Sequence, residues 1–136
     1  MKSIFLPLSI LIFLSLCTSC SSIPKDKLTE LGFPLNQAIS IKYKVDWVQW
    51  GQSKSGGPDD AELVLSENKM RVKIPKINGL FSLDIVRWEG TKFIAKNNLV
   101  YHPYYCEINY RQLRCQHNKL PEVDYQSIAT YTLLYE

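Results

Sequence analysis

Residues 38–49 read AISIKYKVDWVQ, and this stretch decides the fold. From Ile39 to Trp47, apolar side chains stand at every second position, with polar or charged side chains between them. The apolar positions are Ile39, Ile41, Tyr43, Val45 and Trp47. Successive side chains of a strand point to opposite faces, so a period of two places all five on one face. We therefore predict a long, half-buried β-strand here.

The chain beyond this strand repeats the pattern in shorter pieces. Alternation recurs around Leu63, Val72, Leu83 and Phe93, and turn residues separate these pieces. Asn78 followed by Gly79 is the strongest short hairpin signal in the chain. These features predict a succession of short antiparallel strands.

Three stretches interrupt the alternation. Residues 51–60 contain Gly-Gly-Pro and read as a loop. After Ile85 the parity slips, since Val86 and Trp88 are apolar on the other face, and this predicts a bulge or a strand covered on both sides. Residues 125–135 are rich in Tyr, Thr and Leu, which allows a closing strand or a helix.

About eight short strands and no long amphipathic helix predict an all-β protein. The economical architecture is a single antiparallel meander, curled into a small barrel or folded as a sandwich. We place this β-domain at residues 38–136. Residues 20–37 precede it as a tether with a short helix, which Pro24 would begin and Gly32 would end.

The first residues have the composition of an export signal. Lys2 supplies a positive charge, an apolar run follows from Ile4 to Leu16, and small residues surround Cys20. This run is too short to span a bilayer as a permanent helix. We therefore expect residues 1–19 to be a cleaved signal peptide.

The end of this signal, Cys17-Thr18-Ser19-Cys20, resembles the lipobox of a bacterial lipoprotein precursor. The resemblance covers residues 1–20 only. It implies that diacylglycerol is attached to Cys20 and that cleavage just before Cys20 leaves it as the acylated N-terminus. Modification at Cys17 instead would put Leu16 where a small residue is needed. Ser21, where an Asp usually retains such proteins in the inner membrane, implies lipid anchoring in the outer membrane, facing the periplasm.

Composition narrows the class of partner. Of 136 residues, 117 remain after removal of the first 19, and the formal net charge falls from +3 to +2 with the loss of Lys2. That is one small domain with a mild charge, unlike the clustered basic footprint of a nucleic-acid-binding protein. We expect no nucleic-acid partner.

Two cysteines, Cys106 and Cys115, belong to the predicted β-domain. A turn centred on Tyr110 and Arg111 would set them directly opposite each other in a hairpin, within the range that a disulfide tolerates. The same register would set Glu107 opposite Arg114 on the other face. We predict a structural disulfide that pins this hairpin.

The same cysteines could instead be metal ligands together with His102 and His117. The spacing matches no zinc-finger pattern, and oxidation would compete for the thiols in an exported protein. We therefore predict no metal site and no cofactor.

Aromatic residues supply the candidate binding surface. Trp47 shares the parity of the apolar face and is assigned to the core, whereas Trp50 has the opposite parity and stands beside the Gly-rich stretch. Tyr104 and Tyr105 belong to a tyrosine-rich segment next to Cys106. Because Tyr and Trp are enriched at binding hot spots, we predict that Trp50, Tyr104 and Tyr105 contribute a recognition surface if they are exposed.

Lysines on the polar faces of the predicted strands are a second candidate surface. Lys42 and Lys44, together with Lys69, Arg71 and Lys73 and followed by Lys76, would form a basic face if their strands were neighbours. The alternative, which we favour, is an ordinary solvated sheet surface whose charges are neutralised by nearby carboxylates.

No G-x-S-x-G, H-E-x-x-H or phosphate-loop motif is found in the sequence, so we expect no enzyme. The leading hypothesis is a membrane-anchored, non-catalytic binding or accessory module for a protein partner or an anionic envelope component. One alternative is a carrier that holds a small molecule or lipid inside a β-barrel. Another is an envelope hydrolase, or an inhibitor of one, with His102 or His117 beside a carboxylate.

Overall fold

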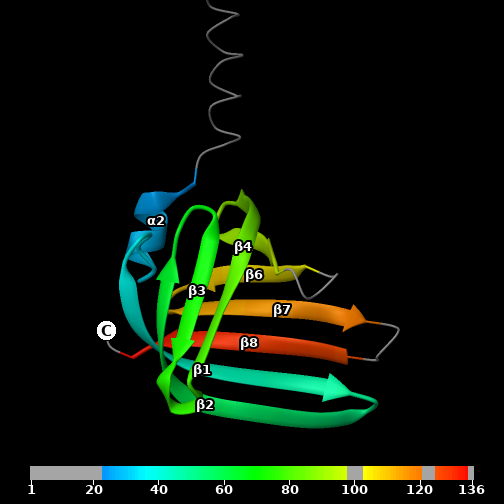
Figure 1. The fold of residues 1–136 in the computed structure, drawn as a ribbon. Coiled ribbons are helices and arrows are strands. Elements are labelled where there is room, and N and C mark those ends of the chain that lie inside the picture. The colour runs from blue at the N-terminus through cyan, green and yellow to red at the C-terminus, as the bar shows by residue number, and fades with distance from the viewer. Residues whose placement is uncertain (1–22, 98–102, 121–124, 135–136) are drawn as a thin grey trace, which may run out of the picture.

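The computed structural model describes residues 23–97, 103–120 and 125–134. These residues form one short helix, one 3-10 turn and eight strands, which Figure 1 shows in order of colour. The elements are α2 (Lys25–Glu30), β1 (Ala38–Gln49), β2 (Gln52–Leu65), β3 (Lys69–Ile74), η2 (Pro75–Ile77), β4 (Gly79–Glu89), β5 (Lys92–Lys96), β6 (Tyr104–Asn109), β7 (Gln112–Leu120) and β8 (Tyr125–Leu133).

The strands form one closed antiparallel barrel. Each strand pairs with the next along the chain, and β8 pairs with β1 over the register from Ile41 opposite Leu133 to Gln49 opposite Tyr125. The predicted all-β meander is confirmed, and of the two architectures left open the chain adopts the barrel. Residues 125–133, which allowed a strand or a helix, form the strand that closes it.

Strands β1 and β2 make a hairpin that is longer than the sequence indicated. The prediction of a loop at residues 51–60 is wrong, because β2 begins at Gln52 and pairs with β1 as far as Val64. Trp50 and Gly51 form the tight turn, with φ of 53° and 76°. Gly57 lies where the register shifts, and a side chain there would collide with the carbonyl oxygen of Tyr43. A bulge thus absorbs the Gly-Gly-Pro sequence that looked like a loop.

Strand β4 contains the predicted bulge. Its register with β5 shifts between Ile85 and Arg87, so both Val86 and Arg87 face outward. Trp88 then returns to the inner face, where its ring lies 4.8 Å from that of Phe93. The turn before β4 also forms as predicted, with Asn78 in the left-handed region at φ 49° after η2.

The barrel interior is filled by apolar side chains from the strands. Those at most 4% exposed include Ile41, Leu63, Val72, Leu83, Ile108 and Leu113. Tyr43 lies among them, with its ring 5.3 Å from Tyr131 and 6.0 Å from Phe81. These side chains form the hydrophobic core of the barrel.

The short helix α2 and the residues after it cover one end of the barrel (Figure 1). Leu28 of the helix and Phe33 after it are completely buried. The backbone N–H of Phe33 donates to the carbonyl of Leu28 at 2.8 Å, and that of Arg111 donates to the carbonyl of Leu31 at 3.1 Å. The expected helix near Pro24 is therefore present, and its apolar side chain completes the core.

Candidate functional site

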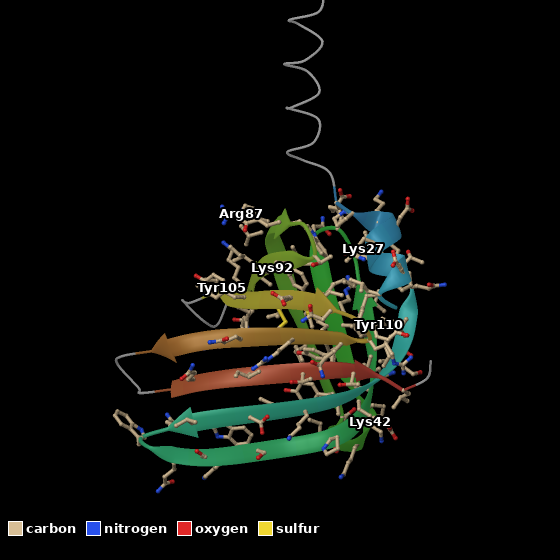
Figure 2. The ribbon with its side chains drawn as sticks, turned by 180° about the vertical axis from the view of Figure 1, so that it is seen from behind. Lys27, Lys42, Arg87, Lys92, Tyr105 and Tyr110 are labelled. Atoms are coloured by element: carbon tan, nitrogen blue, oxygen red, sulfur yellow. A yellow bond between two sulfur atoms is a disulfide. The ribbon has the colours of Figure 1, made fainter. Side chains whose placement is uncertain are left out.

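A concavity of about 520 Å³ opens on the outer surface of β4, β5, β6 and β7. We call it the outer groove and define it by Arg87, Lys92, Ile94, Tyr105, Glu107 and Arg114. Figure 2 shows Arg87, Lys92 and Tyr105 close together on one side of the molecule. Two further concavities, of about 490 and 500 Å³, also open on the outer surface.

Strand alternation and the β4 bulge place these side chains. On β5 and β6, Lys92, Ile94, Tyr105 and Glu107 take the outward positions between buried neighbours. Without the bulge, an outward-facing Val86 would leave the next residue, Arg87, pointing inward. The local parity slip therefore brings a guanidinium to the groove.

The charges of the groove follow the strand register. Lys92 lies opposite Glu107, which lies opposite Arg114 on the next strand. The Lys92 Nζ atom is 3.4 Å from Glu107 Oε2, and Asn109 Nδ2 donates to Glu107 Oε1 at 3.0 Å. These two contacts, the amide of Asn109 first, lower the pKa of the Glu107 carboxyl. Glu107 therefore stays ionised at neutral pH and is unsuited to act as a general acid.

The cations of the groove outnumber its carboxylates. Arg87 Nη2 lies 2.9 Å from the Oε1 atom of Glu89, a second carboxylate at the groove. Arg114 is exposed, and its charge helps to lower the pKa of Glu107 opposite it, but it makes no close ion pair with the residues that the structure describes. With three cations against two carboxylates, the groove carries one excess positive charge beside an exposed aromatic ring. This arrangement suits binding of a ligand with a polar or negatively charged group.

The three predicted recognition residues lie on different surfaces. Tyr105 is 45% exposed in the outer groove. Trp50 is 65% exposed at the tip of the β1–β2 hairpin. Tyr104 is half-buried on the inner face, because consecutive strand residues point to opposite sides, and its ring lies 4.8 Å from that of His117. The structure thus does not bring these residues into one patch.

The predicted hairpin register is confirmed in full. Asn109 pairs with Gln112, Ile108 with Leu113, Glu107 with Arg114, and Cys106 with Cys115. Cys106 and Cys115 form a disulfide, and each is 2% exposed. The disulfide joins the two strands that carry Tyr105 and Arg114, so it braces one wall of the outer groove.

The other sequence candidates have the following positions. His117 is buried at 2% exposure on the inner face, while Cys20 and His102 lie outside the described residues. In the described part of the chain, no three His, Cys, Asp or Glu side chains gather into a group that could hold a metal ion. Nor does any described helix have the length and apolar character needed to cross a membrane.

Three of the five strand cations of the candidate basic face lie near carboxylates, whereas Arg71 and Lys73 make no ion pair among the described residues. Lys42 lies 2.6 Å from Asp60, Lys69 lies 3.8 Å from Asp84, and Lys44 lies 3.9 Å from Asp46. Strand β2 also separates the lysines of β1 from those of β3. These contacts agree with the ordinary solvated surface that we favoured.

Sequence reasoning missed Arg87, Lys92 and Arg114 as parts of one site. Two signals for it were present, namely the parity slip at Val86 and the Glu107–Arg114 pairing implied by the cysteine register. The site also requires that β5 pair with β6, and this pairing has no local sequence signal. Compared with known proteins, the chain matches no family model, and no curated protein or solved structure shows significant similarity to it.

Proposed function

We propose that this protein is an envelope lipoprotein, anchored through Cys20, that acts as a non-catalytic binding module. The lipobox-like signal supports the anchor, and Ser21 supports a position in the outer membrane facing the periplasm. The outer groove would contact a protein partner or another envelope component. This role requires a stable surface held near the membrane, and the barrel supplies such a surface.

The single observation that carries the binding role is the combination of Tyr105 and Arg114 in the outer groove. Tyr105 offers an exposed ring, and Arg114 offers a guanidinium that is not committed to an ion pair among the described residues. Tyr and Arg, together with Trp, are the side chains enriched at binding hot spots. The filled interior favours this surface over the alternative of a carrier that encloses its ligand.

The proposed anchor would hold the barrel close to the bilayer. Three peptide units separate Cys20 from Ile23, and a fully extended chain spans at most about 3.6 Å per residue. The first described residue would therefore lie within about 11 Å of the lipidated cysteine. Ligands of the outer groove would have to be present near the membrane surface.

We expect Cys20→Ala to abolish incorporation of labelled palmitate and to release the protein from the membrane fraction. Two or more acyl chains attach a protein stably to a membrane, whereas the polypeptide without them would have only surface contacts with the bilayer. Cys17→Ala is the matched control and should keep both the label and the membrane attachment. Labelling that survives Cys20→Ala, or is lost in Cys17→Ala alone, would move the anchor to another residue.

The binding role is tested by in-cell crosslinking of the full chain, followed by affinity capture and mass spectrometry. We expect one reproducible partner, whose yield falls roughly tenfold or more in Tyr105→Ala, as for a hot-spot residue. Tyr110→Ala is the control, because Tyr110 is 71% exposed but does not line the outer groove. Equal yields from Tyr105→Ala and the unaltered protein would contradict the groove as the binding surface.

A further inference from the structure

Part of strand β2 has a bare edge. On one side β2 pairs with β1 from Gln52 to Val64, but on the other side it pairs with β3 only from Glu62 to Leu65. Among the described residues, no strand lies along the second edge of residues 52–61. In Figure 1 the β1–β2 hairpin extends past β3 and β4, and β2 forms the outer border of that extension.

The hairpin geometry determines which backbone groups this edge presents. In a hairpin with a two-residue turn, the residues flanking the turn, Gln49 and Gln52, form the first hydrogen-bonded pair. Hydrogen-bonded and non-hydrogen-bonded pairs then alternate along an antiparallel ladder. Ser53 and Ser55 therefore direct their N–H and C=O groups away from β1, whereas Lys54 directs its own toward Trp47 on β1.

Side chains around this edge leave room for another strand. Gln52, Ser53, Lys54 and Ser55 are all exposed, although alternate residues of a strand on a packed core are normally buried. The two serines are small and so allow close approach of a second backbone.

Proteins commonly protect bare edges with lysine, proline or a bulge. Here the bulge and Pro58 end the open stretch at Gly57, so they limit its length and prevent open-ended stacking of strands. They do not cover the outward groups of Ser53 and Ser55. The bare edge that remains is about five residues long. We call residues 53–57 the slot.

The charge at the slot indicates its occupant. Lys54 is exposed and makes no ion pair with any residue that the structure describes, whereas Lys42 and Lys44 of the neighbouring strand β1 have carboxylate partners. Pairing two copies of this edge antiparallel about Ser55 would place two Lys54 side chains diagonally, about 7–8 Å apart. A second copy is therefore disfavoured, and an acidic neighbour is favoured.

We propose that residues 53–57 of β2 bind an extended segment of another protein, which adds one strand to the sheet and places an Asp or Glu beside Lys54. Backbone groups of Ser53 and Ser55 supply the hydrogen bonds, and Lys54 supplies selectivity for the acidic residue. This surface is separate from the outer groove of β4 to β7. It depends neither on that groove nor on the anchor, so each proposal can fail without the other.

The bare edge itself is tested on the purified full chain in detergent micelles by amide hydrogen exchange. We expect the amides of Ser53 and Ser55 to exchange at nearly unprotected rates, while those of Lys54 and Gly56 are protected by their bonds to β1. Slow exchange at Ser53 and Ser55 would mean that the edge is already covered, and this result would overturn the proposal.

Strand addition is tested by photocrosslinking from position 52 of the full chain in the producing cells. Ser55→Pro removes an outward N–H without breaking a bond to β1, and we expect it to reduce the crosslinked product at least about tenfold. Ser55→Ala keeps that N–H and should leave the yield unchanged. Lys54→Glu should lower the yield several-fold, because it opposes the partner's carboxylate.

The pattern across these variants decides the outcome, rather than capture of a partner alone. A product that persists in Ser55→Pro, or the absence of any product from the unaltered chain, would overturn the proposal. A crosslinked product with twice the mass of the chain would show that a second copy of the chain, rather than another protein, supplies the added strand. Ser53→Pro serves as the second variant if Ser55→Pro shifts the denaturation midpoint of the purified protein.

Discussion

Replacing Phe33 by alanine should lower the free energy of unfolding by about 3–5 kcal/mol, a large share of the stability of a domain this size. Phe33 is completely buried at the covered end of the barrel, beside the equally buried Leu28 of α2. Removing the ring would leave a cavity that the hydrogen-bonded strand ends around it cannot close. The measurement is a denaturant titration of the purified protein, compared with the unaltered chain.

Leu80→Ala is the matched control for this prediction. Leu80 is a large apolar residue on β4, but it is 75% exposed, so its truncation should change the free energy of unfolding by no more than about 0.5 kcal/mol. Similar losses from both substitutions would show that Phe33 does not complete the core. The comparison separates burial at the barrel end from a general loss of apolar side chain.

Removal of the disulfide should have the second-largest effect. We expect the double substitution Cys106→Ala and Cys115→Ala to cost about 2–3 kcal/mol, because the bond closes a short loop and so restricts the unfolded chain only moderately. Alanine avoids placing a new polar group at two positions that are each 2% exposed. The thermal midpoint should fall by roughly 10 °C, as measured by circular dichroism.

Reduction of the unaltered protein with a thiol is the control, and it should produce a loss of similar size. The double variant should respond to the reductant no further. An unchanged melting temperature in the double variant would contradict the predicted contribution of the bond. Because β6 and β7 carry Tyr105 and Arg114, the variant should also weaken binding at the outer groove.

The strands that were predicted correctly share a strong local signal. Residues 39–47 alternate without exception, and the cysteine hairpin has one register that pairs Cys106 with Cys115 and Glu107 with Arg114. In both cases side chains a few positions apart carry the whole of the information. The parity slip at Val86 likewise predicted the bulge of β4.

The misassigned stretch shows where local signals fail. Gly56, Gly57 and Pro58 favour a loop on their own, but β1 offers a continuous row of backbone partners that extends β2 across them. The outer groove also escaped prediction as a unit, because Arg87 and Arg114 meet through the order of four strands rather than through spacing in the sequence. Closure into a barrel, which decides both features, has no motif of its own.

Pairing of β1 with β8 has a consequence for how the chain can be delivered. The two strands are separated by most of the domain sequence, yet each supplies the missing neighbour of the other. While a ribosome or a translocation channel still holds residues 125–133, the barrel stays open along the whole seam, with edges of β1 and β7 unsatisfied. Completion of the fold must therefore wait for release of the last strand.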